Sequence, residues 1–309
     1  APSRGNRGSM DSRFRGNDKN ELGMGQRWTP IQYPATKTKK ENMTMKKLGT
    51  TLLILLFAVS LGVTDGLAHT RRYVFNQEYR TIPQGMFEIE NWVKFKVPNR
   101  QKSNVRTWEY EEELEYGLTD RFTIANYHTW ETKNKKGPDD STVYKGFKIE
   151  AKYRIGEKGK YWVDPLLYFE WKREVRAKNE NVFESKLILS KDFGKLNLNY
   201  NQIMENQLGS GGRTAQQFTV GTNYEFPHDI HVGVEAKGDY WRPGSHRNRI
   251  SLGPALAWEG KYFWVAASLL FGLNRAADDF EARAIVGIPL PFDSSSFLKK
   301  LSGDKSNAA

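Results

Sequence analysis

Charged side chains recur at every second position in several stretches of this 309-residue chain. Four glutamates, Glu109, Glu111, Glu113 and Glu115, alternate with mostly aromatic or aliphatic residues in the segment 105–118. Successive side chains on a β-strand point to opposite faces, so this spacing places all four carboxylates on one face. Such a row can pair with basic side chains or select solutes by charge.

A second row mixes the two signs of charge. Lys148, Glu150, Lys152 and Arg154 alternate with apolar residues in the segment 146–155. The alternation of charges continues further along the chain at Glu170, Lys172, Glu184, Lys186, Glu235, Lys237, Asp239, Glu281 and Arg283. Because Arg or Lys at mid-depth in a bilayer costs about 2–4 kcal/mol, these faces must contact water or other charges. Either they pair into a network that fills an interior, or they line a pore.

Few residues of the sequence occur in patterns that are typical of catalytic sites. A membrane-bound hydrolase needs a Ser and a His oriented by a third polar group. The five histidines are His69, His128, His228, His231 and His246. None forms such a Ser–His pattern, and His246, beside Ser245, is interpreted as a solvated loop side chain. His228 and His231 with Asp229 offer too few ligands for a metal site, and cysteine is absent. We expect no catalysis, no metal and no cofactor.

The segment Gly146–Trp171 indicates which elements position the charges. Two alternating runs flank residues 156–160, where Gly156 and Gly159 can supply the positive φ angles of a tight turn. Each run has one apolar and one charged face. The segment is therefore predicted to be a β-hairpin, and the same pattern recurs along the chain.

About 12 strands, most of about 9–12 residues, are predicted in this way. Short turns alternate with longer loops, at 133–141, 173–181, 205–214, 241–247 and 274–280. Strands of this length can cross a bilayer at a tilt, and this asymmetry of connections is typical of membrane barrels. We predict an all-β fold, an antiparallel up-and-down transmembrane β-barrel over residues 86–292. The side chains predicted to line its lumen are Glu109, Glu111, Glu113, Glu115, Lys148, Glu150, Lys152, Arg154, Glu170, Lys172, Glu235, Lys237, Asp239 and Arg283.

Tryptophans near the ends of the predicted strands suggest aromatic girdles at the two membrane interfaces. Those residues are Trp92, Trp108, Trp130, Trp162, Trp171, Trp241, Trp258 and Trp264. The alternative is that they are core aromatics of a soluble β protein.

The chain ahead of the barrel divides into three parts. Residues 1–44 are polar without apolar periodicity and are predicted to be disordered, possibly a spurious upstream extension. Residues 45–68 combine a basic start, an apolar run and a small-residue cleavage site, the features of a signal peptide cleaved after Ala68. Residues 69–85 form an aromatic N-terminal segment of the barrel, either a strand or a piece folded into the lumen.

The end of the barrel departs from simple alternation. The apolar face from Ala282 onward could end at Phe292, an aromatic end of the kind that barrel-assembly machinery reads. Pro289 and Pro291 lack N–H donors, so strand pairing is predicted to stop near Ile288. Residues 293–309 form a polar C-terminal tail.

Three segments carry a resemblance to a known class of proteins. They are EYGLTDRF at Glu115–Phe122, DPLLYFEW at Asp164–Trp171 and LGPALAW at Leu252–Trp258. In this order and spacing, the body of the chain resembles bacterial outer-membrane β-barrel proteins of the porin-like or transporter-like kind. The resemblance implies a cell outer membrane location, with lipid, lipopolysaccharide and the barrel-assembly machinery as partners.

The function predicted from these observations is a channel or transporter for small polar solutes with a charged lumen. Two alternatives stay open: a non-conducting barrel that acts in structure or surface interaction through its loops, and a barrel-borne lipid hydrolase. Nucleic acid is not expected as a partner. Residues 1–68 hold 11 of the basic and 5 of the acidic residues, which leaves a net charge of +5 of the total +11 for the rest of the chain.

Overall fold

The computed structural model of the chain describes residues 71–98, 105–134, 142–175, 180–209, 211–241 and 248–291. The predicted disordered extension, signal peptide and C-terminal tail, as well as Phe292, lie outside these residues. Within the described ranges, no helix is long and apolar enough to span a membrane.

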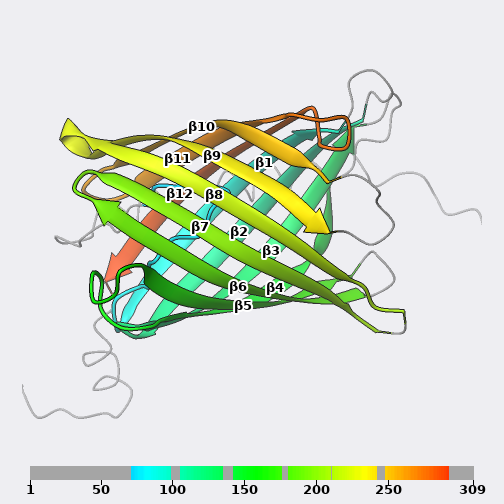
Figure 1. Ribbon diagram of the computed structural model, residues 1–309. Coiled ribbons are helices and arrows are strands. Elements are labelled where there is room, and N and C mark those ends of the chain that lie inside the picture. Colours follow the sequence, from blue (N-terminus) through cyan, green and yellow to red (C-terminus); the bar gives the residue numbers. More distant parts are fainter. Residues whose placement is uncertain are drawn as a thin grey trace, which may run out of the picture. The chain divides into compact units, whose positions relative to one another are not determined.

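Twelve antiparallel strands form a closed barrel in which each strand pairs with its neighbours in sequence and β1 pairs with β12 (Figure 1). The strands are β1 (Met86–Val97), β2 (Arg106–Thr119), β3 (Phe122–Asn134), β4 (Thr142–Arg154), β5 (Asp164–Glu174), β6 (Glu180–Phe193), β7 (Leu196–Leu208), β8 (Thr214–Phe226), β9 (Ile230–Trp241), β10 (Ile250–Glu259), β11 (Trp264–Gly272) and β12 (Phe280–Pro291). The closing pair runs from Met86 opposite Pro291 to Val97 opposite Phe280. The predicted up-and-down barrel of about 12 strands is confirmed.

Short and longer connections alternate along the chain, except at the connection between β4 and β5. Residues 120–121 join β2 to β3, residues 194–195 join β6 to β7, and the short 3-10 turn η1 (Pro227–Asp229) joins β8 to β9. The predicted turns differ from the structure in two places. The β4–β5 connection covers residues 155–163, longer than the tight turn expected, although Gly156 and Gly159 have φ angles of 91° and 80°. Residues 191–195 are predicted from their composition to be a turn, but β6 continues through the first three of them, to Phe193.

Alternation along each strand separates an apolar outer wall from a polar interior. Leu256 of β10 and Ile149 of β4 are 54% and 50% exposed. By contrast, Glu113 of β2 and Glu150 of β4 are each 1% exposed. The charged rows therefore face inward and the aliphatic rows face outward, as the period of two requires.

The prediction that pairing stops near Ile288 is wrong. β12 pairs with β1 as far as Pro291, with Pro289 opposite Glu88. On the other side, β12 pairs with β11 only as far as Gly287, which lies opposite Trp264. Beyond that residue β12 has one unpaired edge, and proline is tolerated where its nitrogen faces such an edge.

Candidate functional site in the barrel lumen

Residues 71–85, which we call the plug, run through the interior of the barrel without joining the sheet. The sequence is compatible with a strand or an interior segment here, and the structure shows the interior segment. At the end of the barrel that carries the short turns, Ile82 N donates to Thr123 Oγ1 at 2.8 Å, and Tyr79 Oη donates to Gly156 O at 2.8 Å. The buried plug residues are Arg71, Tyr73, Val74, Phe75, Asn76, Glu78, Tyr79, Thr81 and Ile82.

Glu235 of β9 holds the middle of the plug. Its Oε1 accepts hydrogen bonds from three consecutive backbone N–H groups, those of Val74, Phe75 and Asn76, at 3.1, 2.8 and 2.9 Å. Glu235 is fully buried. Because the plug belongs to no sheet, these three donors need a partner outside regular secondary structure, and a carboxylate is a strong acceptor. Glu235 therefore ties the plug to the barrel wall.

A row of asparagines on β7 holds the plug from a second wall. Tyr73 Oη donates to Asn197 Oδ1 at 2.8 Å, and Gln77 N donates to Asn201 Oδ1 at 2.7 Å. The side-chain amides of Asn199 and Asn201 donate in turn to Gln77 O. Sequence analysis did not single out these residues. Their signal was the alternation in LNLNYNQ, where neutral amides occupy the positions that carry charge in other strands.

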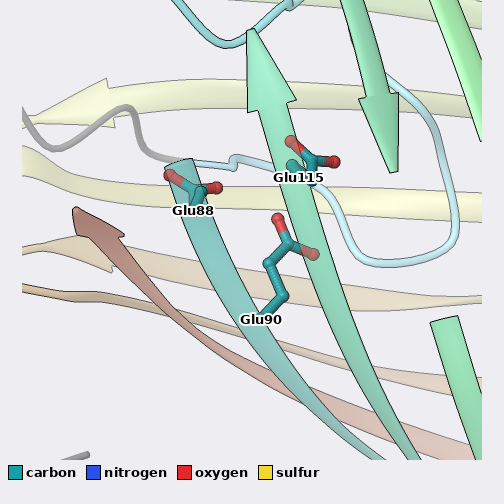
Figure 2. Close-up of side chains that lie close together, drawn as sticks. All are labelled: Glu88, Glu90 and Glu115. Atoms are coloured by element: carbon teal, nitrogen blue, oxygen red, sulfur yellow. The ribbon is translucent and has the colours of Figure 1, made fainter. Parts of the chain in front are cut away.

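Two arginines anchor the plug to β1. Arg71 Nη1 lies 3.1 Å from Glu90 Oε2, and Arg80 bonds to Glu88 with its Nη1 3.8 Å from Glu90 Oε1. Burial alone would lower the pKa of Arg71, but Glu90 and neighbouring glutamates raise that pKa above its ordinary value and keep the guanidinium charged. Figure 2 shows Glu88 and Glu90 on β1 and Glu115 on β2 grouped on one side of the two strands.

The rest of the plug packs on apolar patches of the inner wall. One cluster joins Val74 and Phe75 to Trp92, Ala257, Trp264, Ala266, Leu270 and Ile285. A second cluster joins Tyr79 to Leu166, Tyr168 and Ile188. The inner wall is therefore not uniformly charged. Its apolar patches are covered by the plug, which keeps them out of water.

Two of the tryptophans assigned to the aromatic girdles are inside the barrel. Trp92 is 5% exposed and Trp264 has no exposed surface. Trp92 lies under the Arg71 guanidinium, 4.6 Å from it, and Trp264 fills the space where a side chain at Gly287 would point. Both occupy the inward-facing positions of their strands, so the girdle prediction is wrong for them. Trp258, at 38% exposure, faces outward.

A cavity of about 390 Å³ occupies the part of the lumen that the plug leaves free. Its wall includes strand-end residues next to the longer connections, such as Lys96, Lys172 and Arg249, and plug residues Val74 and Phe75. The plug thus closes the cavity toward the end with the short turns.

Opposite charges pair across the cavity wall. Lys94 Nζ lies 3.3 Å from Glu109 and 3.1 Å from Glu111, and Lys148 Nζ lies 3.1 Å from Glu111. Glu281 contacts three cations at once, those of Lys96, Lys237 and Arg283. Each of these buried charges therefore has a partner of opposite sign, which offsets the cost of removing it from water.

The structure places the fourteen predicted lumen residues at two levels. Eight are in the cavity wall: Glu109, Glu111, Lys148, Glu170, Lys172, Lys237, Asp239 and Arg283. Six lie outside the cavity wall: Glu113, Glu115, Glu150, Lys152 and Glu235 are buried, and the half-buried Arg154 lies over the ring of the plug residue Tyr79. Sequence reasoning did not separate the two groups, because the level of a residue depends on where the plug passes.

The histidines within the described ranges do not form a hydrolase site. His231 is 7% exposed on the inner face of β9, and His128 Nδ1 lies 2.9 Å from Tyr144 Oη on the outer face. His228 occupies η1 with a positive φ of 65°. His69 and His246 lie outside the described residues. No serine hydrogen-bonds to a histidine among the interactions of the described residues, so the geometry gives no nucleophile activated by a base.

Comparison with known proteins supports the fold. No protein-family model and no curated protein match the sequence. Among solved structures, an outer-membrane channel from Pseudomonas putida F1 matches with a TM-score of 0.51 and 12% identity, over 71% of this chain and 100% of that chain. The KdgM porin and the translocator domain of the autotransporter NalP from Neisseria meningitidis give TM-scores of 0.44 and 0.43 at 12% and 13% identity. These cover 66% and 79% of this chain, and 99% and 97% of their own. The first of these matches shows that the chain has the fold of an outer-membrane β-barrel, which confirms the predicted resemblance at the level of the fold.

Proposed function

We propose that this protein is an integral outer-membrane channel or transporter for small polar solutes, which the plug closes in the described conformation. The observation that carries the proposal is the charged cavity of about 390 Å³ inside a closed barrel with an apolar outer wall. A charged cavity inside a barrel can admit a polar solute and select it by charge.

The cavity wall also suggests the class of solute. Its charges are of both signs and are paired with one another, as at Lys94 with Glu111. A neutral or zwitterionic polar solute can hydrogen-bond to such a wall without breaking its ion pairs, whereas a strongly charged solute would have to compete with them.

The proposed location is the cell outer membrane, reached through a signal peptide cleaved after Ala68. Membrane lipid and lipopolysaccharide would contact the apolar outer wall, and the barrel-assembly machinery would insert the chain. The wall of the cavity gives no support to catalysis.

The plug favours a second candidate function, a non-conducting barrel that acts through its loops. Hydrogen bonds that plug N–H groups donate to Glu235 and to the β7 asparagine Asn201, together with the ion pairs of Arg71 and Arg80, join the plug to several walls. If these contacts never break, the plug stays in the lumen and the barrel passes no solute.

Conductance in planar bilayers tests the two candidates. The mature chain is compared with a variant that lacks residues 71–82, and the heat-dependent gel migration of both proteins checks that the barrels have folded. We expect low or intermittent conductance from the mature chain and steady, larger conductance from the variant. A folded variant without conductance would refute the channel, and equal conductance from both proteins would refute the closing role of the plug.

A further inference from the structure

Five buried carboxylates lie together beside the plug, on β1, β2 and β4. They are Glu88, Glu90, Glu113, Glu115 and Glu150, and each is at most 1% exposed. Three cations form ion pairs with this carboxylate cluster: Arg71, Arg80 and Lys152. With all five carboxylates ionised, the described part of the carboxylate cluster would carry two more negative than positive charges in a site without access to bulk water. Uncompensated buried charge is strongly destabilising, so either a further positive group or bound protons must balance it.

The carboxylate cluster contains two groups of three residues, each with carboxylate oxygens within 4.8 Å of one another. The first group is Glu88, Glu90 and Glu115 (Figure 2). The plug arginines Arg71 and Arg80 form ion pairs with its two β1 carboxylates, those of Glu88 and Glu90. The second group is Glu113, Glu115 and Glu150. Among the described residues, one cation forms ion pairs with it, Lys152 Nζ, at 2.5 Å from Glu115 and 3.0 Å from Glu150. The missing positive charge therefore belongs to the second group.

Glu113 is the residue that points to a ligand. Its Oε2 accepts a hydrogen bond from Trp92 Nε1 at 3.1 Å. Its Oε1 is buried and has no hydrogen-bond partner, and Glu113 forms no ion pair within the described part of the chain. A buried carboxylate oxygen without a partner loses its hydration without compensation, at a cost of about 1–3 kcal/mol or more.

We propose that Glu113, Glu115 and Glu150 bind a divalent metal cation, Ca²⁺ being the best match. Ca²⁺ takes carboxylate oxygens at about 2.3–2.6 Å, so two of its ligands are at most about 5 Å apart, which agrees with the spacing of this group. Its charge of two equals the surplus of the carboxylate cluster. Trp92 and Tyr127 line the cavity and donate hydrogen bonds to Glu113 and Glu150, so the site lies directly behind the cavity wall.

The site is independent of solute passage, so binding rather than conductance tests it. The folded, metal-free barrel is prepared in detergent without lipopolysaccharide and titrated with Ca²⁺ by calorimetry. It is titrated separately with Tb³⁺, whose luminescence the nearby Trp92 indole should sensitise. Glu113→Gln removes one charged ligand and keeps the shape of the side chain. Glu184→Gln is the matched control, because Glu184 is an inward-facing carboxylate that pairs with its own lysine, Lys186, at 2.7 Å.

We expect one saturable Ca²⁺ site per barrel, sensitised Tb³⁺ emission that Ca²⁺ displaces, and a rise in Tm with Ca²⁺. In Glu113→Gln the Kd for Ca²⁺ should rise about tenfold or more, because a charged ligand is lost. The control should bind as the original protein does. If Glu113→Gln is poorly folded, Glu150→Gln takes its place with the same expectation. The proposal is overturned if the folded barrel shows no saturable binding, or if the variants at 113 and 150 bind as tightly as the control. In either case bound protons, rather than a metal, would balance the carboxylate cluster.

Discussion

At the scale of single residues, Glu235 is the most sensitive point of contact between plug and wall. Glu235→Ala removes the acceptor of three backbone N–H groups, and each buried group left without a partner costs about 1–3 kcal/mol. We expect the barrel to stay folded while the plug spends more time outside the lumen. Planar-bilayer recording should show conductance about tenfold or more above that of the original protein.

The control for this variant is Glu205→Ala. Glu205 also faces the lumen from the cavity wall, but it accepts its hydrogen bond from Gln217 of the wall rather than from the plug. It should leave the closed state unchanged. Equal conductance from the two variants would show that Glu235 does not hold the plug.

Alternation predicted which face of a strand a residue occupies, but not what that residue would contact. Glu111 and Lys152 face inward as expected, because charge at alternate positions has a single acceptable side in a membrane barrel. Trp92 and Trp264 were assigned by residue type instead of by position, and the assignment is wrong for that reason. Their places in β1 and β11 are inward ones, where indole rings can pack against plug residues.

At the scale of elements, β10 contains a local irregularity at its pairing with β11. Leu252 pairs with Phe271 and Ala255 pairs with Ser268 in the same register, but the pairing of β10 with β11 is interrupted at the two residues between them, Gly253 and Pro254. A Cβ added at Gly253 would lie 1.7 Å from the backbone oxygen of Leu269. Only glycine allows this close approach of two backbones.

Gly253→Ala should therefore disturb the β10–β11 pair, because backbone cannot yield as a flexible side chain can. We expect a loss of about 2 kcal/mol or more of folding stability, within the range for backbone strain. Urea titration of the heat-dependent gel shift in lipid vesicles measures this loss. Ser251→Ala, at an inward position two residues earlier, is the control and should change stability little. A Gly253→Ala barrel as stable as this control would contradict the close approach.

The strands could be predicted from sequence because each one carries its own period of two. The path of the plug could not, since residues 71–85 have no period and their partners are spread over β1, β3, β7, β8 and β9. The end of β12 was missed for a related reason. Whether a proline is tolerated depends on how far the neighbouring strand extends, and that length belongs to β11.

At the scale of the whole molecule, the barrel is a wall with one apolar and one polar side, and its stability depends on which side meets lipid. Leu256 lies near the middle of β10, faces outward at 54% exposure and pairs with Ala267 and Val232. Leu256→Arg should lower the free energy of unfolding in bilayers by about 2–4 kcal/mol, the cost of an arginine at mid-depth. Gln217→Arg places the same side chain in the wall of the cavity, where water and Glu205 can accommodate it, and should change stability far less. Reversible urea unfolding in lipid vesicles, followed by tryptophan fluorescence, measures both variants. Equal losses would mean that the outer wall does not contact hydrocarbon, which would contradict the membrane orientation on which the channel proposal depends.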